Sequence, residues 1–247
     1  MPRLEGGRTL YGLELGVLML DTRFPRLPGD VGNAETWPFP AHYAVVKGAD
    51  PSRIMGKDPD PALLAPFVEA ARDLERLGVR AITTSCGFLA IFQQELQAAL
   101  SVPMLSSALL QVPFVSRVIG PGKRVGILTE RANLTERHFN GVGWSAKDIP
   151  VHVVAMPEGA VFPTVFIDNH ATADAAVLEH EMLELSRSAL KQHPDIGAFV
   201  LECTNFVPFS QAMRRASRLP VYDLYTLVMQ TFLATAAPDF PRAGERL

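Results

Sequence analysis

The 247-residue chain contains only two cysteines, no long apolar run and no marked excess of charge of either sign. No apolar stretch reaches the ~18 residues that a membrane-spanning helix needs. The net charge of −3 provides no basic surface, so nucleic acid is not expected as a partner. The first residues include Glu5 and Glu14, and no small-residue cleavage site follows the apolar run 15–20. These absences favour a cytoplasmic protein that binds neither nucleic acid nor membranes.

Cofactor and metal motifs are also lacking. One disulfide between the two cysteines would suit a secreted protein, but without a signal peptide two free thiols are expected. His180 and Glu184 lie one helical turn apart, yet the second histidine of a zinc motif is missing. The segment Gly120-Pro-Gly-Lys123 resembles a phosphate loop, but it precedes a predicted strand instead of following one. We therefore predict no metal and no cofactor.

Apolar runs alternate with segments of helical spacing along the chain, which predicts an α/β fold of mostly parallel sheets flanked by helices. Strands are predicted at 13–20, 43–47, 79–84, 102–105, 124–129, 151–155, 196–201 and 220–223. Helices are predicted at 61–77, 86–100, 131–140, 171–190 and 224–236, with others beginning near 107 and after 203. Loops are predicted at 25–40 and 157–163, and a polar tail contains Pro238 and Pro241.

The chain carries one pattern twice, and each copy holds one of the two cysteines. Cys86 and Cys203 each follow a predicted strand and open a segment with helical spacing. Phe, Gln and Pro recur at the same distances after each cysteine, as Phe92, Gln94 and Pro103 and as Phe209, Gln211 and Pro220. The repeat predicts two pseudo-symmetric lobes that can exchange terminal helices. Their approximate boundaries are 1–118 plus 221–247 for the first lobe and 119–220 for the second.

Parallel sheets bind ligands beyond the carboxyl ends of their strands, so the cleft between the lobes is the predicted site. Both cysteines, Asp21 and Thr129 are expected there. A cysteine at a helix start meets the positive end of the helix dipole, which favours the thiolate and predicts a lowered pKa. Arg23, just beyond the first strand, can pair with a substrate carboxylate, as can Arg26; a solvated loop arginine is about equally expected.

Two thiols that face each other across a cleft suit one reaction class. One thiol, as thiolate, removes a proton from a carbon next to a carboxylate, and the other delivers a proton to the opposite face. Backbone N–H groups near Gly87 and Thr204 can stabilise the enolate. A single free cysteine is more often a small buried hydrophobe. Matching positions in a repeat favour a functional pair.

The sequence resembles the aspartate/glutamate racemase superfamily, which includes glutamate, aspartate and hydantoin racemases, arylmalonate decarboxylase and maleate isomerase. The resemblance covers essentially the whole chain and is most specific at Thr84-Ser-Cys86-Gly and Glu202-Cys203-Thr204-Asn205. It implies that Cys86 and Cys203 are the catalytic residues. The residues expected to bind substrate are Asp21, Thr22, Arg23, Ser85, Gly87, Phe88, Thr129, Thr204 and Asn205.

Three departures bear on the substrate. Glutamate racemases have Asn-Thr where this chain has Gly87-Phe88, and His where it has Asn205. The amino-group and carboxylate contacts of glutamate racemases therefore do not carry over, and Gly87-Phe88 favours a less polar or derivatised substrate. Glu202 replaces the usual small residue, and it either tunes the thiol or pairs with a neighbour.

The sequence thus predicts a cofactor-independent isomerase, namely a racemase or epimerase of an amino acid or a derivative, with a small-molecule carboxylate as substrate. A cis–trans isomerase or a decarboxylase of the same superfamily is the first alternative. A two-lobed carboxylate-binding protein without enzyme activity is the second. A homodimer is a further expectation.

Overall fold

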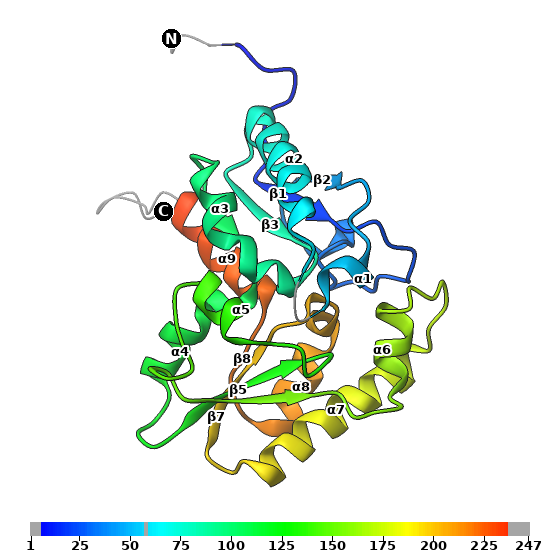
Figure 1. Ribbon diagram of the computed structural model, residues 1–247, viewed down its shortest axis with the longest axis vertical. Coiled ribbons are helices and arrows are strands. Elements are labelled where there is room, and N and C mark those ends of the chain that lie inside the picture. The colour runs from blue at the N-terminus through cyan, green and yellow to red at the C-terminus, as the bar shows by residue number, and fades with distance from the viewer. Residues whose placement is uncertain (1–5, 57–58, 237–247) are drawn as a thin grey trace, which may run out of the picture.

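The computed structural model describes residues 6–56 and 59–236, which form two lobes that each contain one parallel sheet (Figure 1). Residues 1–5, 57–58 and 237–247, and with them the predicted tail, lie outside the described residues. Helices flank both sheets, and the two sheets repeat one topology. The predicted α/β fold with two pseudo-symmetric lobes is confirmed.

Each described sheet has four strands in the same order, β2-β1-β3-β4 and β6-β5-β7-β8, and all neighbouring strands are parallel. The central strands β1 and β5 are almost continuously apolar because helices cover both faces of the sheet. The strands are β1 (Leu15–Met19), β2 (Ala41–Val45), β3 (Ala81–Thr84), β4 (Met104–Leu105), β5 (Arg124–Thr129), β6 (Val151–Ala155), β7 (Ile196–Leu201) and β8 (Val221–Tyr222).

Most of the predicted helices are present, and two short ones were not predicted. The α-helices are α1 (Pro51–Ile54), α2 (Leu64–Leu77), α3 (Gln93–Ala98), α4 (Val112–Val118), α5 (Glu136–Gly141), α6 (Val161–Phe166), α7 (Ala175–Gln192), α8 (Ser210–Ser217) and α9 (Leu224–Thr235). Helix α6 begins inside the predicted loop 157–163, because Phe162 and Phe166 turn inward against the apolar core of the second lobe. Helix α1 is only one turn long, too short for a periodic pattern to reveal.

The segment that follows each cysteine begins as a 3₁₀-helix rather than as an α-helix. These two segments are η3 (Gly87–Phe92) and η5 (Thr204–Phe209), and they lead into α3 and α8. Pro208 lies inside η5. The other described 3₁₀ segments are η1 (Ala34–Thr36), η2 (Pro61–Leu63) and η4 (Ala108–Gln111).

Two helices each follow a strand of one sheet but pack on the other sheet, so that they cross from one lobe to the other. Residues of η4 and α4, among them Leu109 and Val115, pack in one apolar cluster with Val125 of β5 and Val200 of β7. Helix α9 instead packs on the first sheet, where Leu227 shares a cluster with β1 and β3 (Figure 1). Strand β8 pairs with β7 in the second sheet. The predicted boundaries after 118 and 220 therefore fall beside these crossing segments, and the division of the chain into lobes stays a prediction.

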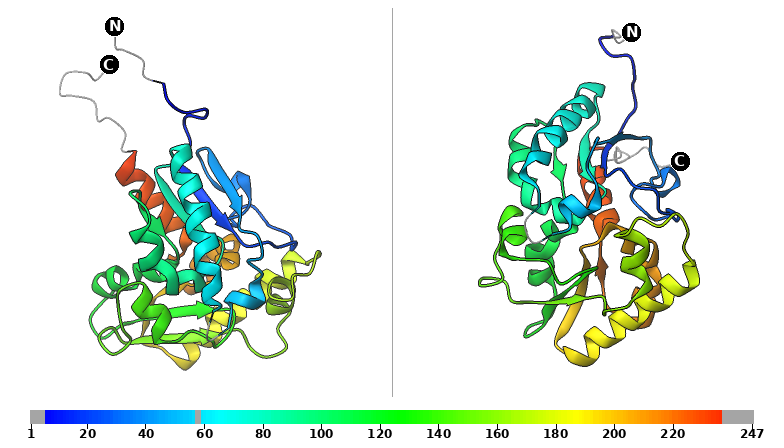
Figure 2. Two further views of the ribbon diagram at one scale, coloured as in Figure 1. Left: turned by 45° about the horizontal axis from the view of Figure 1, so that its top comes forward. Right: turned by 45° about the vertical axis from the view of Figure 1, so that its right-hand side comes forward.

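The loop at 25–40 lies folded against the molecule between the two lobes (Figure 2). Its buried Asp30 forms a 2.6 Å ion pair with Arg26, and Trp37 stacks on Tyr225 of α9. Phe24, just before the loop, contacts Phe166 of α6 edge-on. The segment after β1 thus contacts α9, which packs on the first sheet, and α6 of the second lobe.

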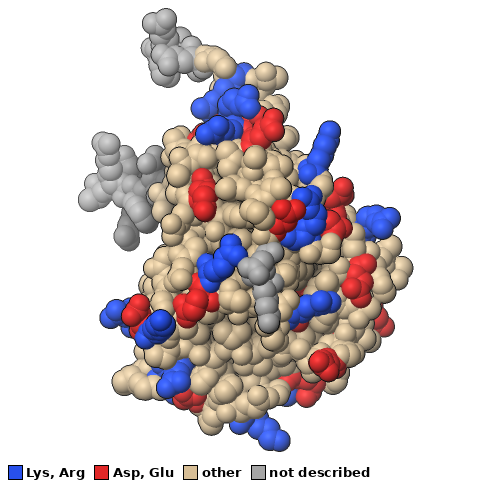
Figure 3. Space-filling view, in the orientation of Figure 1, with Lys and Arg blue, Asp and Glu red and all other residues tan. Residues whose placement is uncertain are grey.

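Acidic and basic side chains are interspersed over the face shown in Figure 3, without a broad area of one sign. Among the described helices, none is both long enough and apolar enough to cross a membrane.

Candidate active site

A cavity lies at the carboxyl ends of the central strands, and residues of both lobes line it. Both cysteines line this cavity, and both are buried, free thiols. The lining residues are Leu20, Thr22, Phe24, Arg26, Pro51, Met55, Ser85, Cys86, Gly87, Phe88, Glu130, Phe166, Glu202, Cys203, Thr204 and Asn205. The repeat thus brings its two cysteines to one site.

Three residues predicted to bind substrate do not line the cavity. Asp21 and Arg23 are exposed, whereas Thr22 between them does line it. Successive side chains of an extended segment point to opposite sides, so only one of these three neighbours turns inward. Thr129 is buried behind the cavity wall, where its hydroxyl contacts Glu202. The other predicted residues, Ser85, Gly87, Phe88, Thr204 and Asn205, line the cavity with the cysteines.

A hydrogen bond between the lobes joins the two cysteine segments, and a second bond within the first lobe supports it. The Thr204 hydroxyl donates a 2.7 Å hydrogen bond to the carbonyl oxygen of Ser85, one residue before Cys86. The Ser85 hydroxyl in turn accepts a 2.9 Å bond from the backbone N–H of Leu20. These bonds tie the end of β1 and the start of η5 to the residue before Cys86.

Two buried carboxyl groups accompany the thiols. The Cys203 thiol donates to Oε2 of Glu130 at 3.3 Å, and the Thr129 hydroxyl donates to Oε2 of Glu202 at 2.7 Å. Each of these glutamates is only 1% exposed. Glu202 was singled out from the sequence, whereas Glu130 was missed. The available signal was its place directly after the strand 124–129, where a charged residue borders the cleft.

Burial is the largest influence on the pKa values of these two carboxyl groups and two thiols, and it raises all four. It raises the pKa of Glu130 to about 8 and that of Glu202 to about 7, although hydrogen bonds from Cys203 and Thr129, respectively, lower each of them. Burial raises the pKa of the Cys86 thiol, and the negative charge of Glu202 raises it further. Burial likewise raises the pKa of the Cys203 thiol, and the negative charge of Glu130 raises it further.

The predicted lowering of the thiol pKa values is therefore wrong. Backbone N–H groups after each cysteine do favour the thiolate, as expected at a helix start. Desolvation and two nearby carboxyl groups outweigh that effect. A thiol in this state is a weak acid, and its thiolate is correspondingly a strong base.

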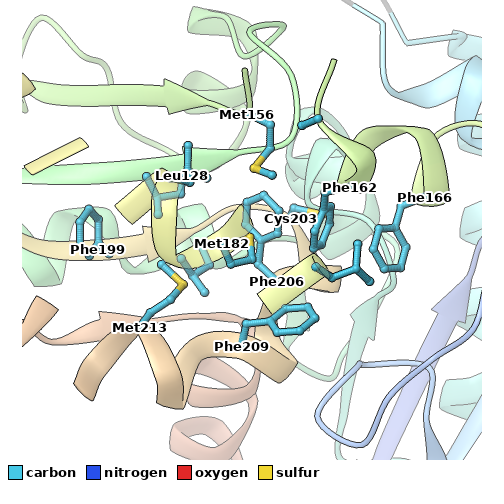
Figure 4. Close-up of a cluster of buried hydrophobic side chains, with 14 of the residues drawn as sticks. Leu128, Met156, Phe162, Phe166, Met182, Phe199, Cys203, Phe206, Phe209 and Met213 are labelled. Atoms are coloured by element: carbon cyan, nitrogen blue, oxygen red, sulfur yellow. The ribbon is translucent and has the colours of Figure 1, made fainter. Parts of the chain in front are cut away.

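Each thiol sits at the border of an apolar cluster. Cys203 lies among Phe162, Phe206 and Met182 of the second lobe (Figure 4), and Cys86 belongs to the corresponding cluster of the first lobe. Such surroundings exclude water from the reacting groups. In the described part of the chain, no three His, Cys, Asp or Glu side chains are arranged to hold a metal ion.

Arg26 is the one Lys or Arg among the described residues that line the cavity. Its guanidinium donates to Asp30 at 2.6 Å and to the Thr22 hydroxyl at 2.8 Å, and it lies 4.5 Å from the centre of the Phe24 ring. These contacts fix its position at the end of β1. Of the two arginines considered as partners for a carboxylate, Arg23 and Arg26, only Arg26 reaches the cavity.

Comparison with known proteins identifies relatives over nearly the whole chain, although no protein-family model matches it. A dimethylsulfoniopropionate lyase from Durusdinium sp. clade D is 30% identical over 237 residues, which cover 93% of this chain and 77% of that protein. Dimethylsulfoniopropionate lyase 7 from Emiliania huxleyi (strain CCMP1516) is 28% identical over 93% of this chain and 69% of its own length.

Solved structures share the fold. Unliganded arylmalonate decarboxylase superposes with a TM-score of 0.56 at 14% identity, over 92% of this chain and 94% of that one. A glutamate racemase from Bacillus anthracis gives 0.55 at 17% identity, over 91% and 83%. The predicted resemblance to the aspartate/glutamate racemase superfamily is thereby confirmed at the level of the fold.

The predicted activity, in contrast, is wrong. The relatives that match nearly the full chain are lyases, which argues against a racemase, an epimerase or any other isomerase. A pair of thiols does not decide between these reactions, because removal of a proton next to a carboxylate begins eliminations as well as racemisations. The chain belongs to the family of the dimethylsulfoniopropionate lyases, built on the fold of the aspartate/glutamate racemases.

Proposed function

We propose that this chain is a lyase that eliminates a neutral sulfide from a small sulfonium carboxylate, with dimethylsulfoniopropionate as the first candidate. The observation that carries the proposal is the 30% identity over 93% of the chain to a lyase of that name. The buried cavity supports it, because its thiols and carboxyl groups can supply a base for proton removal.

The reaction follows from the structure of the compound. A base removes a proton from the carbon next to the carboxylate, and the freed electron pair forms a double bond to the neighbouring carbon. The carbon–sulfur bond breaks, and its electrons go to the positively charged sulfur. Dimethyl sulfide leaves as a neutral molecule, and acrylate remains. Because this leaving group needs no proton, a single base is sufficient.

Cys203 is our candidate for that base. Its thiol proton can move to Glu130, which accepts its hydrogen bond and has a pKa raised by burial to about 8. The resulting thiolate takes the proton of the substrate and becomes a thiol again. Glu130 then carries the proton that left Cys203, and its release to solvent restores the starting state. The raised pKa of Cys203 makes its thiolate a strong base once formed.

Arg26 is our candidate for binding the substrate carboxylate, since a fixed guanidinium pairs well with a carboxylate. Negative charge builds up on that carboxylate as the proton leaves, so the same contact would stabilise the transition state. We assign Cys86 to the cavity wall, where backbone N–H groups of Phe88 and Leu89 hold its sulfur.

The proposal is tested by incubating the purified chain with dimethylsulfoniopropionate and measuring dimethyl sulfide by headspace gas chromatography. We expect steady release, with equimolar acrylate in solution. Cys203→Ala should lower kcat by about 10²–10⁴-fold, as expected for loss of a general base. Cys86→Ala keeps the proposed base and should lose less. If the unmodified chain released no dimethyl sulfide, the proposed substrate would be wrong.

A further inference from the structure

Three residues that line the cavity each have one buried side-chain oxygen without a hydrogen-bond partner among the described residues. These oxygens are Oε1 of Glu130, Oε1 of Glu202 and Oδ1 of Asn205. All three residues line the same cavity, and they are 1%, 1% and 7% exposed. Buried acceptors without a partner are costly, and each one in a folded protein needs an explanation. Three of them at one cavity indicate a ligand that meets acceptor oxygens.

The charges around these oxygens are unbalanced. Cys86, Cys203, Glu130 and Glu202 all lose a proton to become negative, and they come from both lobes. Arg26 already pairs with Asp30. Arg131 acts on Glu130 from an exposed position outside the cavity wall. Among the described residues that line the cavity, the one basic side chain, Arg26, is thus paired with Asp30 and not with Glu130 or Glu202.

We propose that Glu130 and Glu202, with Asn205, form a subsite for the positively charged end of the substrate, so that the chain takes zwitterions whose onium group lies two carbons from a carboxylate. This inference rests on the proposed function and adds the residues that recognise the cation. Glu130 and Glu202 follow β5 and β7 of the second sheet, while Arg26 follows β1 of the first. Residues of different lobes would thus bind the two charged ends of the substrate.

The chemistry of a sulfonium group fits these oxygens. A dimethylsulfonium centre has no N–H or O–H to donate, so acceptor oxygens attract it through charge and through its polarised methyl groups. Apolar side chains of Leu20, Met55 and Phe166 line the same cavity and can contact the methyl carbons. A neutral branched alkyl group of the same shape would leave the three oxygens without compensation.

Binding of the cation would also change the ionisation of Glu130 and Glu202. The pKa values of Glu130 and Glu202 lie near 8 and 7 because burial penalises their charged forms. A cation beside them offsets that penalty and favours their ionisation. An ionised Glu130 is the form that can accept the Cys203 proton. The substrate would therefore supply the charge that prepares the base for its own reaction.

The test compares two ligands that differ by one atom and by charge. These are 3-(trimethylammonio)propanoate and 4,4-dimethylpentanoate, in which a carbon replaces the charged nitrogen. Calorimetric binding to the full chain at pH 8 should favour the cation by at least about tenfold. Glu130→Gln and Glu202→Gln should each reduce this ratio, and the double variant should bring it near one. Glu184→Gln removes an exposed carboxylate on α7, away from the cavity, and should leave the ratio unchanged.

A second measurement uses the unmodified chain and avoids any loss of folding. The ratio should fall by at least about threefold from pH 8 to pH 6, since the carboxyl groups become protonated below pKa values near 8 and 7. A ratio near one at pH 8, a ratio independent of pH, or no measurable binding of the ammonium ligand would each overturn the cation subsite.

Different outcomes would overturn the proposed lyase activity and the proposed cation subsite. Release of dimethyl sulfide together with a ratio near one would overturn the subsite and leave the lyase activity standing. A ratio above ten without any dimethyl sulfide would support the subsite and overturn the proposed substrate.

Discussion

The carboxyl group of Glu202 lies directly against Gly87, across the boundary between the lobes. A Cβ atom at Gly87 would overlap Oε1 of Glu202 and the backbone carbonyl oxygen of the same residue. The residue after the first cysteine therefore contacts the residue before the second, and only glycine leaves room for this contact. Glycine here permits a close approach; the backbone at Gly87 is not in the left-handed region.

Gly87→Ala should therefore damage both stability and activity. The added methyl group meets the backbone of Glu202, which cannot move aside as a flexible side chain can. We expect a loss of about 1–3 kcal/mol in the free energy of unfolding, typical of overpacking. Denaturant unfolding measures this loss, and dimethyl sulfide release should fall with it. Gly120→Ala is the matched control, because a methyl group added there would lie 4.0 Å from its nearest neighbour. Equal effects of both substitutions would contradict this explanation by packing.

Arg26→Met should weaken binding of the carboxylate end of the substrate. Loss of a charged hydrogen-bond donor typically costs about 1.5–3 kcal/mol, which corresponds to about a 10–100-fold higher KM. Both test ligands carry the same carboxylate, so their affinities should fall together while their ratio stays constant. Arg23→Met removes a nearby exposed guanidinium that does not line the cavity, and it serves as the control. A loss confined to the cationic ligand would argue against this role for Arg26.

Thr129→Val should shift the pH dependence of substrate binding. The Thr129 hydroxyl donates to Glu202 and lowers its pKa, so removal of the hydroxyl raises that pKa. A higher pH is then needed to ionise Glu202, and the rise of kcat/KM with pH should move upward by about one unit. Measurement of dimethyl sulfide release from pH 5 to pH 9 gives the profile. An unchanged profile would mean that ionised Glu202 does not contribute to binding.

The buried carboxyl groups should make the protein less stable as the pH rises. Their folded-state pKa values, about 8 for Glu130 and about 7 for Glu202, exceed the value of about 4.3 expected for glutamate in an unfolded chain. Between these values the folded protein binds more protons than the unfolded chain, so the free energy of unfolding decreases with pH. Glu130→Gln removes this dependence for one group.

The variant should therefore gain stability relative to the unmodified chain between pH 5 and pH 8, by up to about 3–4 kcal/mol. His138 works in the opposite direction, because burial lowers its pKa to about 4, but it is present in both proteins and cancels in the difference. Denaturant unfolding at several pH values provides the measurement. A difference that did not change with pH would show that Glu130 ionises normally.

Much of the fold was predictable from local pattern, because buried parallel strands are short apolar runs between turns. The strand 124–129 and the repeat around Cys86 and Cys203 needed no further information. The sequence placed α9 in the first lobe, but it gave no sign that α4 packs on the second sheet, since helical periodicity shows which face is apolar but not which sheet that face covers. The place of the two cysteines at the site was predictable, because each one follows the carboxyl end of a parallel strand.

Other parts of the site depended on contacts between distant segments. Asp21 and Thr22 are adjacent in sequence, and only the path of the chain after β1 decides which one turns inward. The raised pKa values of the thiols arise from burial and from Glu130 and Glu202, whose approach to the cysteines is set by packing. The leaving group of the substrate has no signature in a pair of cysteines, so elimination could not be told from racemisation.

The crossing of α4 and α9 makes the two halves of this duplicated molecule dependent on each other. A half cut at the middle of the chain would keep a helix that belongs on its neighbour and would lack the one that covers its own sheet. Each half would then expose an apolar sheet face to water. The repeat is therefore kept in the strand order of the two sheets, whereas each sheet depends on a helix from the other half to cover its apolar face.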